Sequence, residues 1–260
     1  GATDPELLSC LTLPQSWLAD IPGRTFAAVK LAMIAADMQQ PEQLLTQARK
    51  WFGGNPVVAS MVGRDAHSLA VTDFMLRHSG FERMLVIMPN DSSETRAGRV
   101  SQRLLEIETY RLMALRGLPV AKLLIPELTS AEQQLADITA QLENKVASDQ
   151  ELLDTLIALA ARIERATVEH AYRFAATQAY SKLVTQRITE LREQALPGTQ
   201  TIGQFMQRRL TPAIATVEAT SQRMSYLSAR IARASALLRT RVDIQTETQN
   251  QQLLEKLTRG

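Results

Sequence analysis

The residues able to do chemistry in this chain are few and scattered. Asp65, His67 and Asp73 lie close together in the sequence and could bind an ion, although such residues more often form an ordinary polar loop. The other two histidines, His78 and His170, have no partner at the spacing that binds a metal on one helix. There is no glycine-rich phosphate loop and no GxSxG motif around a nucleophilic serine. We therefore predict that the chain is not an enzyme.

Composition excludes several classes of protein. The chain has 260 residues, of which 45% are hydrophobic, so it is long enough and apolar enough to fold. The formal net charge of +2 is too close to balance to indicate a nucleic-acid-binding protein. The single cysteine, Cys10, cannot form an internal disulfide. No apolar stretch reaches the roughly 18 residues that a membrane-spanning helix needs.

The first third of the chain predicts a small α/β domain of about four strands. Short apolar runs bounded by turn-forming residues occur at Phe26–Ile34, Val57–Val62, Leu69–Leu76 and Phe81–Met88. The last three follow one another with tight gaps, which is typical of an antiparallel meander. Apolar residues at helical spacing predict a helix over Glu42–Phe52. The order of the strands does not follow from the sequence.

Helices are predicted from about residue 92 onward. Ser92 or Ser93 is expected to cap a helix that ends before residue 119. A short helix through Leu123 is expected next. Ser130 is then expected to cap a separate helix over Ala131–Leu142.

Two long runs without proline or glycine follow, Ser148–Gln194 and Ala213–Arg259. Each would form a helix of about 70 Å at 1.5 Å per residue. Glu151 lies three residues after Ser148, the spacing of a capping box at a helix start. Apolar residues recur every three or four positions in both runs, which predicts a coiled-coil-like antiparallel hairpin or a bundle. Pro212 predicts a kink or break just before the second run.

The predicted fold class is therefore α+β: a small α/β head followed by a long helical stalk. We predict three segments. Residues 1–91 form the small α/β domain, residues 92–147 form connecting helices that pack on it, and residues 148–260 form the long helical hairpin.

Charge and polarity along the second long run leave two questions open. Seven arginines and one acid lie between residues 203 and 241. They form either a solvated face partly paired with acids of the first long run, such as Asp149, or a surface for acidic lipids or nucleic acid. Aromatic residues are scarce there, which argues against nucleic acid. Beyond Val242 the polar side chains either lie in water or approach a membrane, a pore or neighbouring subunits.

The chain also resembles a bacterial family of uncharacterised membrane-anchored proteins, the domain of unknown function 3422. The resemblance rests on Leu13–Gly23 (LPQSWLADIPG), Ala97–Leu124, Tyr172–Glu193, Thr201–Ala213 (TIGQFMQRRLTPA), Ala232–Ile244 and Glu247–Leu254. It implies a C-terminal membrane anchor after residue 260 and a location at the cytoplasmic face of the bacterial inner membrane. It names no activity.

The layout is similar to that of CorA-type magnesium transporters, in which a small α/β domain precedes a long helix that leads to the membrane. This similarity implies a homo-oligomeric ring, and Mg²⁺ as a candidate ion held between subunits by Asp65, Asp73 and Asp243. The GMN signature of those channels is not in these residues. Layout alone does not establish function.

Two functions are therefore expected from the sequence. The first is a membrane-anchored oligomeric stalk or sensor that takes part in divalent-cation transport or its regulation. The alternative is a coiled-coil scaffold that binds another protein, without ion chemistry. No nucleic-acid partner is expected in either case.

Overall fold

The computed structural model describes residues 13–144 and 147–259. Cys10 lies outside these residues. The chain divides into two compact units, each built from two separate stretches. The first, called the α+β unit, comprises Gly1–Leu115 and Thr177–Ile214. The second, called the helical unit, comprises Arg116–Ala176 and Ala215–Gly260. The predicted α+β class with long helices is confirmed. Two helices, α5 and α7, each contribute residues to both units. The division into three segments stays a prediction.

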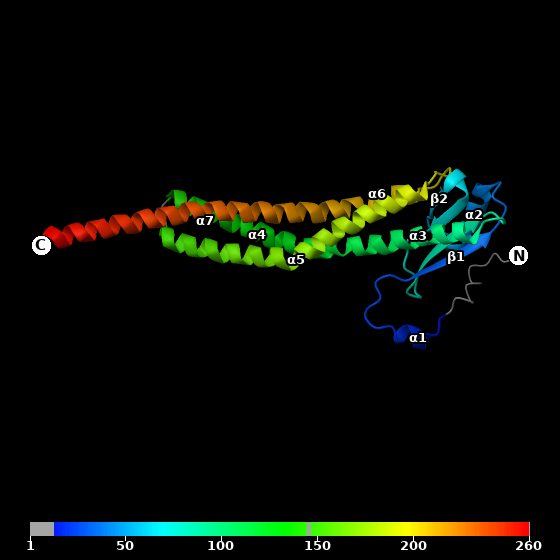
Figure 1. The fold of residues 1–260 in the computed structure, drawn as a ribbon, viewed down its shortest axis with the longest axis horizontal. Helices are drawn as coiled ribbons and strands as arrows, with labels where there is room; N and C mark the ends of the chain where they lie inside the picture. The colour runs from blue at the N-terminus through cyan, green and yellow to red at the C-terminus, as the bar shows by residue number, and fades with distance from the viewer. Residues whose placement is uncertain (1–12, 145–146, 260) are drawn as a thin grey trace. The chain divides into compact units, whose positions relative to one another are not determined.

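The α+β unit contains a β-sheet (Figure 1). Its four strands lie in the order β1-β4-β3-β2. The strands are β1 (Val29–Ala35), β2 (Val58–Val62), β3 (Ser68–Thr72) and β4 (Glu82–Met88). The predicted meander is confirmed, because β2 pairs antiparallel with β3, and β3 pairs antiparallel with β4. Strand β1 adds in parallel to β4, with Leu31 opposite Met84.

Both faces of this sheet are covered, which explains why its two inner strands and β2 are nearly continuous apolar runs. Alternation along each strand divides the side chains between the two faces. On one face, Ala59, Val71 and Leu85 pack against Leu45 of helix α2 (Pro41–Trp51) and against Phe52, which directly follows that helix.

The opposite face packs against three helices of the α+β unit. They are α3 (Glu94–Leu115), the end of α5 (Asp149–Leu191) and α6 (Ile202–Arg209). Met84 and Val86 lie in one cluster with Val100, Leu104 and Ile107 of α3, together with further residues of α5 and α6. A short helix α1 (Gln15–Ala19) precedes β1 and buries none of its residues.

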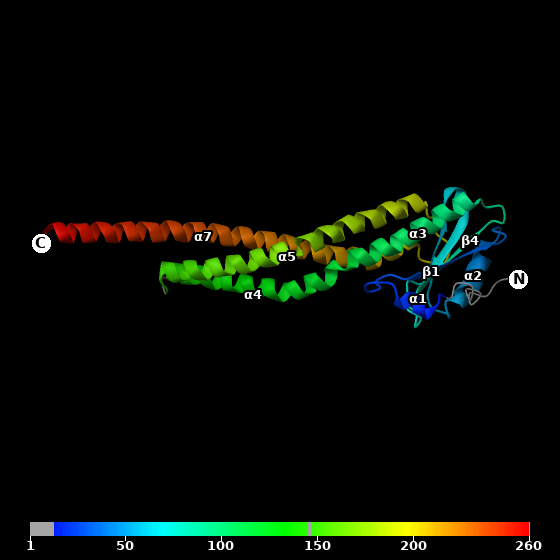
Figure 2. The same ribbon diagram turned by 60° about the horizontal axis from the view of Figure 1, so that its bottom comes forward.

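The helical unit packs three helices around one core: α4 (Gly117–Asn144), the first part of α5 and most of α7 (Thr211–Arg259). Figures 1 and 2 show these segments side by side. Buried residues recur at steps of three and four along α4, as in a coiled coil: Ala121, Leu124, Leu128, Ala131, Leu135 and Ile138. The start of α5 contacts the later part of α7 through an Arg241–Asp149 ion pair of 3.4 Å, and the end of α5 shares a core cluster with the first turn of α7. These two helices therefore run antiparallel, as predicted.

One prediction about the helices was wrong. No break separates Leu123 from Ala131, because α4 continues through Pro126 and Ser130. The buried residues of α4 belong to the core of the helical unit. Two other predictions are confirmed. The Ser148–Glu151 capping box forms with both of its hydrogen bonds at 3.2 Å, and α6 gives way to α7 just before Pro212.

Candidate functional site

An arginine-lined pocket is the candidate site of the α+β unit. Its volume is about 390 Å³. Five arginines, one histidine, one serine and one glutamate supply its polar lining: Arg64, Arg96, Arg99, Arg103, Arg192, His67, Ser68 and Glu190. Gly63 and Val100 complete the wall. We call this cavity the arginine pocket.

Helix α3 supplies three of the five arginines from a single face. Arg96, Arg99 and Arg103 are spaced at i, i+3 and i+7, which places them in a row along the helix. Val100 lies beside this row and is buried against the sheet together with Leu104. This packing fixes α3, and with it the row of arginines along the pocket wall.

The other two arginines, Arg64 and Arg192, lie on two turns of the chain that meet at the edge of the sheet. The segment after α5 pairs with β2, because the amides and carbonyls of Met61 and Gln194 exchange two hydrogen bonds of 3.0 and 2.8 Å. The amide of Gly63 then donates to the carbonyl of Leu191 at 2.7 Å. These bonds place Arg192 beside the turn that carries Arg64.

The backbone of both turns adopts the left-handed region, including at residues other than glycine. Gly63 has φ 89°, Asp65 59°, Ala66 50° and Arg192 50°. Such conformations cost about 1–3 kcal/mol at residues with a side chain, and they concentrate at functional sites.

His67 is held in the wall of the pocket by two serine hydroxyls. Its Nδ1 lies 2.9 Å from Ser68 Oγ, and its Nε2 lies 3.3 Å from Ser92 Oγ. Burial and the positive charge of Arg96 lower the pKa of His67 below its ordinary value, while Asp91 acts in the opposite direction. The imidazole is therefore neutral at neutral pH.

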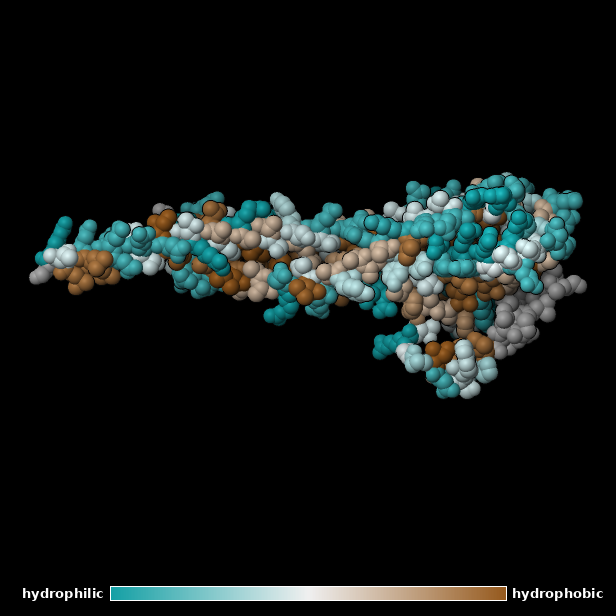
Figure 3. All heavy atoms as spheres, in the orientation of Figure 1, coloured by the Kyte–Doolittle hydropathy of each residue, from teal (hydrophilic) through white to brown (hydrophobic). Residues whose placement is uncertain are grey.

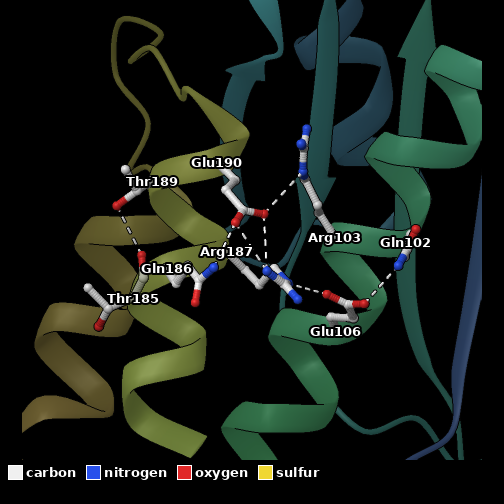
Figure 4. Close-up of polar contacts among 8 residues, drawn as sticks. All are labelled: Gln102, Arg103, Glu106, Thr185, Gln186, Arg187, Thr189 and Glu190. Atoms are coloured by element: carbon white, nitrogen blue, oxygen red, sulfur yellow. Dashed lines mark hydrogen bonds and ion pairs between the residues drawn. The ribbon is translucent and has the colours of Figure 1, made fainter.

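A chain of ion pairs joins α3 to α5 beside the pocket (Figure 4). Arg187 pairs with Glu106 of α3 and with Glu190 of its own helix, the latter at 3.1 Å. Glu190 also lies 3.6 Å from Arg103 Nε. Contacts with Arg187, Arg103 and Gln102 lower the pKa of Glu106, the Gln102 hydrogen bond most strongly. Glu190 and Arg103 belong to both the network and the pocket lining.

The excess of positive charge in the pocket determines which ligands it can bind. Within the described part of the chain, Arg103 is the one lining arginine that forms an ion pair. Arg64, Arg96, Arg99 and Arg192 present guanidinium groups whose donors fit carboxylate, sulfate or phosphate oxygens in pairs. The single carboxylate of the lining, Glu190, is engaged with two arginines. The arrangement can hold a multivalent anion.

A second polar cluster lies inside the same unit. Glu108 is fully buried and forms a bidentate pair with Arg111, with Nε to Oε2 at 2.8 Å. Arg111 also reaches Glu82 of β4 at 3.3 Å and lies over the ring of Phe74 at 5.2 Å. Burial, and next the neighbouring Glu108 carboxylate, raise the pKa of Glu82 to about 8. The cluster joins α3 to the sheet.

The three aspartates predicted as metal ligands lie apart. Asp65 precedes β3 and Asp73 follows it, so the five residues of that strand, roughly 15 Å, separate them. Asp73 pairs with Arg77 and accepts the amide of Met75 at 3.2 Å. Asp243 is exposed on α7, in the helical unit. In residues 13–144 and 147–259, no group of three or more His, Cys, Asp or Glu is arranged to hold a metal ion. A role between subunits stays a prediction.

Two of the seven arginines between residues 203 and 241 form ion pairs among the described residues. Arg241 pairs with Asp149, as one of the two interpretations predicted. Arg223 pairs instead with Glu132 of α4, through two contacts of 2.6 Å. The residues of the arginine pocket come from three separate stretches of the chain, so no local pattern in the sequence predicted the pocket. The one local signal was the spacing of Arg96, Arg99 and Arg103 on a single helix.

These features define a class: an α+β protein with a mixed four-stranded sheet, a three-helix coiled-coil-like unit and a basic pocket at one edge of the sheet. A family model described as "Protein of unknown function (DUF3422)" matches residues 2–260, so the chain belongs to that family. No curated protein and no solved structure matches the chain.

Proposed function

We propose that this chain is a non-catalytic binding protein whose α+β unit holds a small multivalent anion in the arginine pocket. One observation carries the proposal: five guanidinium groups line a single cavity of about 390 Å³, and four of them have no carboxylate partner among the described residues. Like charges that line one cavity repel one another, and a bound anion would relieve that repulsion. The size of the cavity fits a small ligand and not a nucleic acid.

Sulfate titration tests this proposal. Calorimetric titration with sodium sulfate, at an ionic strength held constant with sodium chloride, should give saturable binding. It should also raise the melting temperature, because a ligand that binds only the folded state stabilises it. Replacing Arg96 and Arg99 with Gln should weaken sulfate binding at least tenfold, since each removes a charged donor pair.

A matched control comes from Arg208 and Arg209, two exposed arginines on α6 of the same unit. The Arg208→Gln, Arg209→Gln double variant changes the net charge equally but leaves the pocket intact. Equal loss of sulfate binding in both double variants would mean that only the overall charge attracts the anion. That result would contradict a specific site.

A second candidate function is an oligomeric stalk or sensor of a membrane-anchored, CorA-like assembly at the cytoplasmic face of the bacterial inner membrane, with divalent cations as its ligands. Support comes from the coiled-coil spacing of α7 and from three exposed leucines near its end, Leu253, Leu254 and Leu257, visible as a brown patch in Figure 3. No helix in the described residues is long and apolar enough to cross a membrane. A coiled-coil scaffold for another protein is the alternative to this stalk.

A further inference from the structure

We infer that the ligand of the arginine pocket is a doubly charged oxyanion of the sulfate or phosphate type, and that His67 takes up a proton when it binds. This inference rests on the proposed anion-binding function and adds the ligand class and its dependence on pH. Its basis is the place of His67 in the lining, among the five arginines, together with the two hydroxyls that hold its ring.

The hydrogen bonds of His67 suit both of its protonation states. A serine hydroxyl can donate or accept, because its hydrogen rotates about the C–O bond. For the neutral ring, one serine accepts from the ring N–H and the other donates to the bare nitrogen. For the charged ring, Ser68 and Ser92 both accept. The imidazole can therefore gain a proton without losing either contact of 2.9 or 3.3 Å.

The charges that face His67 come from every neighbouring element of the pocket. Its own turn carries Arg64 and Asp65, and the segment before α3 carries Asp91. Glu190 lies in the last turn of α5, and Arg192 follows that helix. Helix α3 contributes the row Arg96, Arg99 and Arg103. Cations outnumber carboxylates in this set, so the empty pocket disfavours an additional positive charge on the ring.

A bound dianion reverses this balance. Two negative charges within a few ångströms of the ring favour the imidazolium and raise its pKa relative to the empty pocket. By linkage, the anion then binds more tightly as the pH falls through the pKa of His67 in the complex, and the gain levels off below its pKa in the free protein. One linked proton gives at most about a tenfold change in affinity per pH unit. A monoanion supplies half the charge and gains correspondingly less.

Sulfate is the appropriate probe because it stays doubly charged across the neutral range, whereas phosphate monoesters titrate near pH 6. Titrations of the full chain with sodium sulfate at about pH 6, 7 and 8 should show affinity falling at least tenfold from the lowest to the highest pH. In buffers of different ionisation enthalpy, the binding heats should report the uptake of a fraction of a proton near pH 7. Nitrate should give a smaller uptake.

His67→Gln should flatten the pH dependence, because the amide keeps hydrogen bonds to both serines but cannot titrate. His78→Gln is the matched control, since His78 is exposed in the same unit and outside the pocket. Sulfate binding with no pH dependence and no proton uptake in the unmodified protein would overturn the inference while leaving the anion site in place. No sulfate binding at any pH would overturn both this inference and the proposed anion site. If the His67 variant does not fold, the test is the number of protons that the unmodified protein takes up when it binds sulfate.

Discussion

At the scale of single residues, the most demanding position in the fold is Glu82. Its side chain is almost completely buried, and it faces the Glu108 carboxylate, with Arg111 as the cation nearest to both. One guanidinium group cannot neutralise two carboxylates. Glu82 therefore keeps its proton in the folded state to a much higher pH than an exposed glutamate does.

This arrangement makes the stability of the α+β unit depend on pH. Between the ordinary glutamate pKa of 4.5 and the folded value of about 8, the folded state binds more protons at Glu82 than the unfolded state. The free energy of unfolding should therefore fall as the pH rises through this range, by at most about 1.4 kcal/mol per pH unit. Urea unfolding at a series of pH values measures this slope.

Replacing Glu82 with Gln should remove most of that slope, since the amide mimics the protonated acid without titrating. Glu94 begins α3 and is exposed, so Glu94→Gln provides the same chemical change at a position without burial. A pH slope that survives in the Glu82 variant would assign the effect to another group.

At the scale of helices and strands, the sequence predicted those features that depend on residues close together in the chain. Turn formers bounded each predicted strand, and the Ser148–Glu151 spacing correctly marked the start of α5. Ser130 gave a similar local signal and was misleading, because α4 buries Leu128 and Ala131 on either side of it in one continuous core. Tertiary packing here outweighs both a capping residue and the missing amide of Pro126.

The features that the sequence did not predict depend on contacts between distant stretches. The parallel pairing of β1 with β4 joins strands that lie about fifty residues apart, and no local pattern encodes it. The arginine pocket requires Gly63 to meet Leu191 through a backbone bond. Periodicity predicted which side of a helix is buried, but not which other helix or strand it would face.

Thr177 illustrates such a contact and permits a test. Its buried hydroxyl, on α5, donates to the carbonyl of Ala114 in the last turn of α3, at 3.0 Å. Thr177→Val keeps the shape but leaves a buried carbonyl without a donor, which should lower the free energy of unfolding by about 1–3 kcal/mol. Chemical denaturation with circular dichroism measures this change.

Thr185 provides the control for that experiment, because it is exposed on the same helix and donates only to the carbonyl of Ser181. Thr185→Val should change stability by less than about 0.5 kcal/mol. Comparable losses in the two variants would indicate a general effect of valine in α5 and would contradict a specific link between α3 and α5.

At the scale of the whole molecule, each unit has a hydrophobic core of its own, yet one segment of the helical unit belongs to no core. Every described residue from Asp243 to Arg259 is exposed, although α7 continues to Arg259. Isolated helices of this length are marginal in water unless an apolar face finds a partner. Leu253 and Leu257 lie four residues apart, on one face of this segment.

If the second candidate function holds, this face associates with the same face of another copy. Leu257→Gln should then weaken self-association at least tenfold in sedimentation equilibrium, because a two-fold contact loses the leucine from both copies and each buried leucine contributes roughly 1.5–3 kcal/mol. Leu123→Gln on α4 is a close control, since the two leucines are exposed to 74% and 77%. A chain that stays monomeric at high concentration, or equal effects of both substitutions, would leave this face without a role in assembly. The anion pocket does not depend on that outcome, because all its lining residues belong to the α+β unit.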